Sequence, residues 1–242
     1  MNTLLPWQQE QWRNVMERLR AASLPHAILL AGPGGLGKNR FAALLAQTLL
    51  CETGAATGRA CGHCRSCLLY AADSHPDRRI VAPLEAGKAI VVDQVREAGR
   101  YLTQTSQYGG YKTLIITPAD QMNVNAANSL LKTLEEPAAW SLILLVSDRP
   151  GRLPATVLSR CQRLNFTAPE SRQAQQWLVE QIGVVPDIEV DNLPNATFKG
   201  QDAQLDAAIK YLLDKIKEDP RPVPPPPPYP NRKFDYKAGG SH

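Results

Sequence analysis

Short apolar runs alternate with amphipathic segments over the first 183 residues of the chain. The apolar runs of strand length are residues 26–30, 79–81, 112–117 and 142–146. The segments in which apolar residues recur at helical spacing are 6–20, 91–102 and 125–134. Apolar strands that alternate with helices are typical of a parallel sheet covered on both faces. The pattern therefore predicts an α/β fold.

The pattern changes after Gly183. Residues 184–200 are rich in turn formers, residues 202–217 have the spacing of one amphipathic helix, and residues 220–230 are dominated by proline. Each proline ring restricts φ and removes a backbone donor, so we expect the proline run to adopt polyproline II. The C-terminal segment is thus predicted to be a short helix followed by a proline-rich stretch.

Composition separates the same two parts. Of the 20 prolines, 10 lie in residues 184–242, where 8 basic residues stand against 9 acidic ones, so the first 183 residues carry a net charge of +5. A surplus of this size permits contact with nucleic acid or an acidic partner without arguing for either. No run of about 18 apolar residues and no export signal is present, which predicts a cytoplasmic protein without a membrane partner.

A glycine-rich loop follows the first apolar run. Gly32, Gly34, Gly35, Gly37 and Lys38 have the spacing of a phosphate-binding P-loop between a predicted strand and a predicted helix. The next residue is Asn39, at the position where a Ser or Thr hydroxyl would bind Mg²⁺. The alternatives are a glycine turn without a ligand, or a true or degenerate nucleotide loop.

Hydrolysis would also need an acidic residue at the end of a second strand. The strand at 112–117 ends in Thr117 and Pro118, where a carboxylate pair would stand, and Asp120 comes later. ATP hydrolysis by this chain is therefore not expected, whereas nucleotide binding stays open.

Four of the five cysteines fall within 17 residues: Cys51, Cys61, Cys64 and Cys67. Four thiolates complete a closed tetrahedral zinc shell, so this spacing predicts a structural Zn²⁺ site. A redox or disulfide pair and chance clustering are the alternatives. His63 is expected to be a solvated turn residue.

Three further groups of residues attract attention for their chemistry. Arg160, within Ser159-Arg160-Cys161, could reach a neighbouring subunit's γ-phosphate or form a surface ion pair, and Cys161 is expected to fill apolar space. The segment 75–77 reads as a turn. Glu135 and Glu136, which end a predicted helix before a proline, read as an unpaired, solvated face.

Several of these segments together resemble the bacterial DNA polymerase III clamp-loader subunits. The matching segments are 24–27, 32–38, the four-cysteine block, 74–77, 127–137 and 159–161. The resemblance covers residues 1–182. It implies an AAA+ P-loop domain over 1–166 with a zinc module at 51–67, and the start of a helical lid domain at 167–183. Residues 184–242 resemble neither that lid nor the family's collar domain, so we expect a truncated or fused chain.

The departures at Asn39, Thr117 and Pro118 make the chain similar to the delta-prime subunits, the non-hydrolysing stators of the family. This resemblance implies that Arg160 acts in trans as an arginine finger, and that zinc is held by the four cysteines named above. It also implies gamma/tau motor subunits, delta, the sliding clamp and primer-template DNA as partners. The resemblance also implies the nucleotidyltransferase class of the whole polymerase, to which this chain would belong as a subunit without catalytic activity of its own.

Two other functions are compatible with the same residues. One is an ATP-hydrolysing motor of this family, with Asn39 tolerated and Asp120 or Glu135 serving the metal. The other is a zinc-clipped nucleic-acid-binding module.

Overall fold

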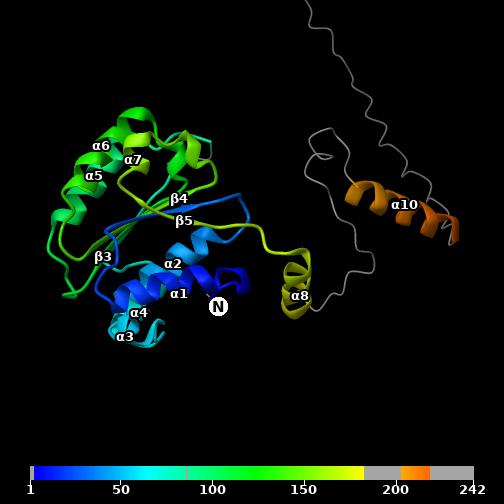
Figure 1. The fold of residues 1–242 in the computed structure, drawn as a ribbon, viewed down its shortest axis with the longest axis horizontal. Helices are drawn as coiled ribbons and strands as arrows, with labels where there is room; N and C mark the ends of the chain where they lie inside the picture. The colour runs from blue at the N-terminus through cyan, green and yellow to red at the C-terminus, as the bar shows by residue number, and fades with distance from the viewer. Residues whose placement is uncertain (1–2, 86, 183–202, 219–242) are drawn as a thin grey trace, which may run out of the picture. The chain divides into compact units, whose positions relative to one another are not determined.

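A computed structural model describes residues 3–85, 87–182 and 203–218 of the chain. The chain divides into two units, residues 1–184 and 185–242. The first unit is built around a parallel sheet (Figure 1).

The sheet has five strands in the order β2-β3-β4-β1-β5. Their bounds are β1 Ala27–Ala31, β2 Arg78–Val81, β3 Lys112–Ile116, β4 Ser141–Ser147 and β5 Gln162–Asn165. All four pairings are parallel, and β1 runs beside β4 from Ala27 opposite Ile143 to Ala31 opposite Ser147. The carboxyl ends of these strands therefore meet at one edge, where ligands of open α/β sheets usually bind.

Helices cover both faces of the sheet (Figure 1). On one face lie α5 (Val92–Thr103), α6 (Val124–Glu135) and α7 (Ala155–Leu158); on the other lie α1 (Gln9–Arg20), α2 (Lys38–Leu50) and α4 (Arg65–Ala71). Strand side chains alternate between the two buried layers, so Leu29 packs with α5 and α6, and Leu30 packs with α2. The predicted α/β fold is confirmed.

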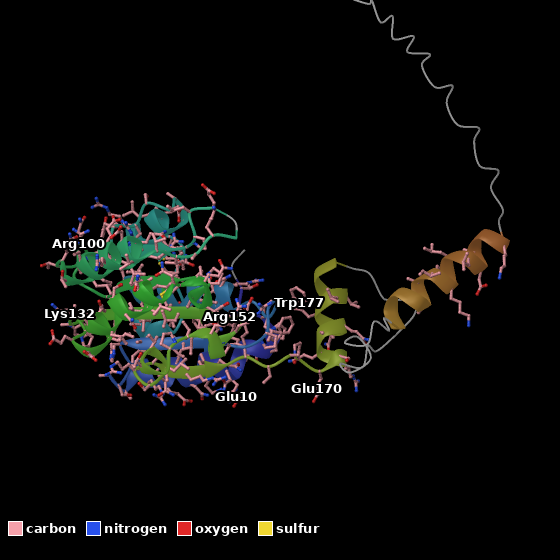
Figure 2. All side chains as sticks on the ribbon, turned by 90° about the horizontal axis from the view of Figure 1, so that it is seen from above. Glu10, Arg100, Lys132, Arg152, Glu170 and Trp177 are labelled. Atoms are coloured by element: carbon pink, nitrogen blue, oxygen red, sulfur yellow. The ribbon has the colours of Figure 1, made fainter. Side chains whose placement is uncertain are left out.

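The N-terminal helix predicted over 6–20 begins with a 3₁₀ turn, η1 (Pro6–Gln8), and continues as α1. Short 3₁₀ turns are common at helix starts. At the other end of the unit, α8 (Ser171–Ile182) carries Trp177 (Figure 2). The Trp177 ring meets that of Trp7 edge-on, with 5.5 Å between the ring centroids. Trp7 and Trp177 thus connect the N-terminal turn with α8.

The sequence pattern did not predict β5. Its side chains are mostly exposed because it is an edge strand paired only with β1, so it lacks an apolar run. The cysteine segment likewise contains two short helices that the pattern did not predict, α3 (Gly54–Thr57) and α4. Two 3₁₀ turns, η2 (Ala119–Gln121) and η3 (Pro150–Arg152), follow β3 and β4.

In the second unit the structure describes one helix, α10 (Ala203–Glu218), close to the predicted 202–217. Ile209 and Leu212, two members of its expected apolar face, are exposed. The predicted turn-rich segment 184–200 and the polyproline segment 220–230 lie outside the described residues. Among the described helices, none combines the length and apolarity needed to cross a bilayer.

Candidate functional site: a P-loop, a cysteine cluster and Arg160

The glycine-rich segment forms a strand-to-helix loop between β1 and α2. Gly37 caps α2 in the left-handed region at φ 77°. This positive φ favours glycine, and a Cβ there would also displace the Leu5 side chain, whose Cδ1 would lie 2.4 Å away. Gln8 and Trp7 donate side-chain hydrogen bonds to the Leu36 carbonyl, at 2.9 and 3.2 Å. The loop thus has the predicted shape, with η1 bound over it.

Lys38, the residue expected to reach terminal phosphates, is fully occupied by the chain itself. Its Nζ donates to the carbonyls of Gly32 at 2.8 Å and Pro33 at 2.5 Å, and lies 2.7 Å from Asp148 Oδ1. An ammonium has three protons, so in this arrangement each proton has an acceptor within the chain. The side chain is only 3% exposed.

Asp148 brings a negative charge to the loop. It directly follows β4, at the carboxyl edge of the sheet, and a Cβ at Gly34 would lie 3.2 Å from its second carboxylate oxygen. An anion held by this loop would meet that carboxylate at close range. Sequence reasoning missed Asp148, although an acidic residue just after a buried parallel strand was a signal available in the sequence.

Two of the three positions that depart from the pattern of the motor subunits, Asn39 and Thr117, contact each other. Thr117 Oγ1 donates to Asn39 Oδ1 at 2.6 Å, joining the end of β3 to the start of α2. Asp120, the later carboxylate, accepts from Ser147 Oγ at 2.7 Å and from the backbone N–H of Asp148 at 3.1 Å. The chain therefore satisfies each of these polar groups internally.

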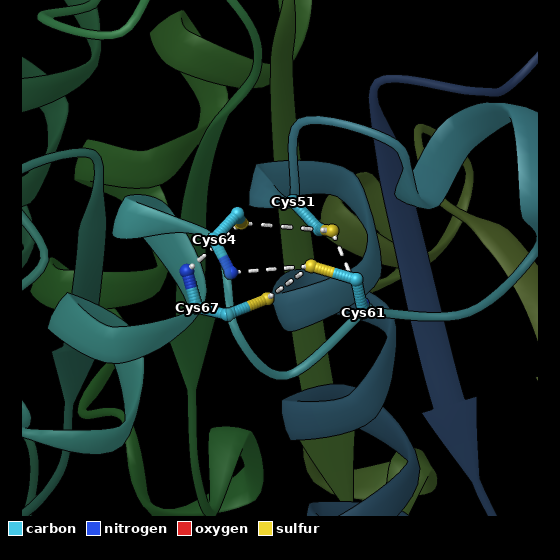
Figure 3. Close-up of side chains that lie close together, drawn as sticks. All are labelled: Cys51, Cys61, Cys64 and Cys67. Carbon is cyan, nitrogen blue, oxygen red and sulfur yellow. Dashed lines mark hydrogen bonds between the residues drawn. The ribbon is translucent and has the colours of Figure 1, made fainter.

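The four predicted zinc ligands converge (Figure 3). All four Sγ atoms lie within 4.8 Å of one another, with Cys61 to Cys67 at 4.0 Å and Cys64 to Cys51 at 3.9 Å. Zn–S bonds of about 2.3 Å in a tetrahedron place sulfurs roughly 3.8 Å apart. The cluster therefore has a geometry that fits a closed tetrahedral zinc site.

Backbone N–H groups point at these sulfurs. Cys61 N–H donates to Cys51 Sγ at 3.3 Å, Cys64 N–H to Cys61 Sγ at 3.3 Å, and Cys67 N–H to Cys64 Sγ at 3.4 Å. Burial opposes the Cys51 thiolate, but hydrogen bonds from Cys61 and Thr53 outweigh burial and lower the pKa of Cys51 to about 6. Hydrogen bonds from His63 and Cys64 also lower the pKa of Cys61.

Cys67 behaves oppositely. Burial, together with the neighbouring Cys64 and Cys51 sulfurs, raises the pKa of its thiol. A divalent cation would offset this cost, because thiolates share its charge when they coordinate it. His63 is exposed and its Nδ1 lies 2.9 Å from the Cys61 carbonyl, as expected for a turn residue.

The segment 75–77 forms the turn predicted from sequence, and it is also a buried polar junction, which the sequence did not predict. Ser66 Oγ donates to the Leu50 carbonyl, so the His75 Nε2–H donates to Ser66 at 2.7 Å, and Nδ1 accepts from Asp77 N–H at 3.1 Å. Burial lowers the pKa of His75, partly offset by the Asp77 charge. This neutral histidine connects α4, which carries Cys67 and is capped by Cys64, to the sheet.

Asp77 completes the junction. Its fully buried carboxylate accepts from Ser106 Oγ and from the backbone N–H groups of Gln107 and Tyr108, each at 3.0 Å. The ammonium of Lys112 lies 4.0 Å away. A buried carboxylate with this many donors is a structural anchor.

Arg160 follows the short helix α7 and is partly exposed. Its Nη1 donates to the Thr156 carbonyl at 2.9 Å, and its Nη2 lies 2.7 Å from Glu135 Oε1, at the end of α6. The expectation that Glu135 is unpaired is therefore wrong, whereas its exposure is as expected. Cys161 packs against the core as expected, and burial raises the pKa of its thiol to about 11.

A profile of the family described as DNA polymerase III, delta subunit, matches residues 7–170. The chain is 46% identical over 178 residues to DNA polymerase III subunit delta' of Pseudomonas aeruginosa, covering 74% of this chain and 53% of the relative. The chain belongs to the DNA polymerase III delta-prime family. The Escherichia coli K12 delta-prime subunit is 36% identical over 183 residues, covering 75% of this chain and 54% of the relative.

The chain spans about half the length of the curated relatives it matches. A tau subunit of DNA polymerase III from Bacillus subtilis is 30% identical over 182 residues, covering 75% of this chain and 31% of that one. A gamma subunit-related protein of Thermotoga maritima has a TM-score of 0.50 at 21% identity, covering 72% of this chain and 50% of that structure. The fold of this delta-prime chain is thus the AAA+ fold.

Proposed function

We propose that this chain serves DNA replication as a non-hydrolysing clamp-loader subunit, one that lends Arg160 to the ATP site of a neighbouring motor subunit. The sliding clamp is then loaded onto primer-template DNA by the assembly, through gamma/tau and delta partners. The observation that carries the proposal is the contrast between a P-loop filled by the chain's own groups and an arginine left partly exposed on the surface.

The P-loop contacts support the non-hydrolysing part. Lys38 directs its three protons to two carbonyls and to Asp148, and Asn39 accepts a hydrogen bond from Thr117. Binding ATP would require the loss of the Lys38–Asp148 pair and the approach of phosphate to a carboxylate, both of which cost free energy. A motor function through Asp120 or Glu135 is disfavoured, because both carboxylates already have partners.

The position of Arg160 supports the second part. A guanidinium stabilises the negative charge that develops on transferring phosphoryl groups, and such a finger can be supplied by an adjacent subunit. Arg160 needs a free path to a neighbour for this role, and its side chain is 36% exposed.

The cysteine cluster has a structural role in this proposal. Cys51, Cys61, Cys64 and Cys67 would hold Zn²⁺ as a closed shell, which leaves no position for a reacting water. The bound ion would hold α4 and the end of α2 together, because Cys51 directly follows α2 and Cys67 lies in α4.

The test is ATP turnover by a clamp loader reconstituted with a full-length subunit carrying this sequence. Arg160→Ala is expected to reduce turnover at the neighbouring site on the order of 10³-fold, as removal of arginine fingers does elsewhere. Arg152→Ala is the matched control, since Arg152 is an exposed arginine in the nearby turn η3. Unchanged turnover with Arg160→Ala would assign this arginine a purely structural role and overturn the proposal.

A further inference from the structure

The contacts of Arg160 have a consequence beyond the finger role itself. Its guanidinium contacts the Thr156 carbonyl on the preceding short helix and the Glu135 carboxylate at the end of α6, and its Nη1 also lies 3.4 Å from Ser159 Oγ. The first contact restrains one nitrogen, Nη1, and the second restrains the other, Nη2. Since α6 and α7 pack in the same core cluster, the Thr156 and Glu135 contacts belong to one packed layer.

A long, flexible side chain that must meet a phosphate in a fixed geometry loses rotamer entropy on binding. Contacts that restrain the side chain beforehand reduce that loss, and catalysis benefits when charged groups are already oriented toward the reacting centre. Nη1 donates to the Thr156 carbonyl and to Ser159 Oγ, whereas the pair with Glu135 uses only one proton of Nη2. The second proton of Nη2 and Nε–H therefore stay available for an incoming phosphate.

We propose that Glu135 is the positioning residue for Arg160. It holds the guanidinium in the orientation in which α7 presents it to a neighbouring subunit's triphosphate. This inference rests on the proposed function, because it assigns Glu135 an effect only through Arg160. Glu135 itself does not touch the nucleotide or the reacting atoms.

The adjacent Glu136 provides a matched control. Both carboxylates lie at the C-terminal end of α6, where a negative charge is unfavourable for the helix dipole, so removal of either has the same electrostatic effect on the helix. Only Glu135 is recorded in an ion pair with Arg160 among the described residues. A difference between the two variants therefore reports the Arg160 contact.

The experiment is steady-state ATP turnover by the reconstituted loader. Glu135→Ala is expected to lower kcat about two- to fivefold, the size of effect of an exposed ion pair, with the KM for ATP unchanged. Glu135→Gln, whose amide oxygen can still accept from Nη2, is expected to restore part of the loss. Glu136→Ala is expected to match the unmodified subunit. Thermal unfolding of each variant checks that the fold is intact.

The same substitution made in the Arg160→Ala background separates positioning from any other role. If Glu135 acts only through Arg160, adding Glu135→Ala to Arg160→Ala gives no further loss. An equal loss in both backgrounds, or normal kcat with Glu135→Ala when Arg160→Ala is defective, overturns the positioning role alone. Normal kcat with Arg160→Ala overturns the proposed function and this inference together.

Discussion

The P-loop and the cysteine cluster are two motifs that the sequence shows by their spacing, and they differ in whether the chain itself pairs their polar groups. In the P-loop the chain supplies its own substitutes for a ligand: Asp148 is an internal anion for Lys38, and Thr117 is a partner for Asn39. In the cluster, four sulfurs face one another at distances that suit a cation. The spacing of a motif therefore predicts the backbone shape of a ligand-binding loop. Residues distant in the sequence determine whether its polar groups already have partners within the chain.

The largest expected effect concerns zinc binding by the cysteine cluster. Cys64→Ser removes one of four thiolates, and in small metal-binding domains the binding of the metal is coupled to folding. We expect about one zinc per chain in the unmodified protein and loss of that zinc in the variant. The midpoint of thermal unfolding should fall on the order of 10 °C. Metal analysis and calorimetry measure these two quantities.

Cys161→Ser is the control for that substitution. Cys161 lies outside the cluster and packs against the core, and burial raises the pKa of its thiol to about 11, so it stays protonated at neutral pH. Its removal should leave the zinc content unchanged. A folded, metal-free protein with paired cysteines would contradict the zinc assignment.

An intermediate effect is expected at the P-loop. Asp148→Ala frees the Lys38 ammonium and removes the carboxylate beside Gly34. Millimolar ATP should then raise the unfolding midpoint of the variant by a few degrees, because a ligand that binds only the folded state stabilises it. The unmodified chain should show no such shift in differential scanning fluorimetry.

The double variant Lys38→Ala/Asp148→Ala is the control, since it lacks the group that would bind the phosphate. Its unfolding midpoint should not respond to ATP. If ATP stabilises the unmodified chain as strongly as it stabilises Asp148→Ala, Asp148 does not oppose ATP binding by the P-loop. That result would contradict the difference drawn between the P-loop and the cysteine cluster.

The smallest expected effect concerns the junction behind the cysteine cluster. Burial lowers the pKa of His75 in the folded state, so below the usual histidine value of about 6.5 the unfolded chain binds more protons than the folded one. Stability from the neutral His75 is complete above that pH and decreases as the pH falls through it. Urea unfolding at a series of pH values measures this slope.

His75→Gln should make the stability less dependent on pH between about 5 and 7, because glutamine cannot be protonated there. Acid also releases zinc from thiolates, so the zinc content is determined on the same samples. An identical slope in His75→Gln at constant zinc content would assign the pH dependence to other groups.

Prediction from sequence succeeded where the determining residues are close together in the chain. The apolar runs of β1, β3 and β4 predicted the buried sheet, and the four cysteines predicted a cluster. It failed for β5, because an exposed edge strand carries no hydrophobic period. It also failed for the Lys38–Asp148 and Glu135–Arg160 pairs, because each joins side chains from separate elements that only the folded sheet and its helices bring together.

The charge pair in the P-loop has a consequence for the physiology of the protein. Many P-loop proteins change shape when a triphosphate arrives or is cleaved, and their state follows the supply of nucleotide. Here the carboxylate that pairs with Lys38 belongs to the same chain, so it does not depart as a cleaved phosphate would. The first unit is accordingly expected to retain the same conformation in starved and in growing cells, whatever the ratio of ATP to ADP around it.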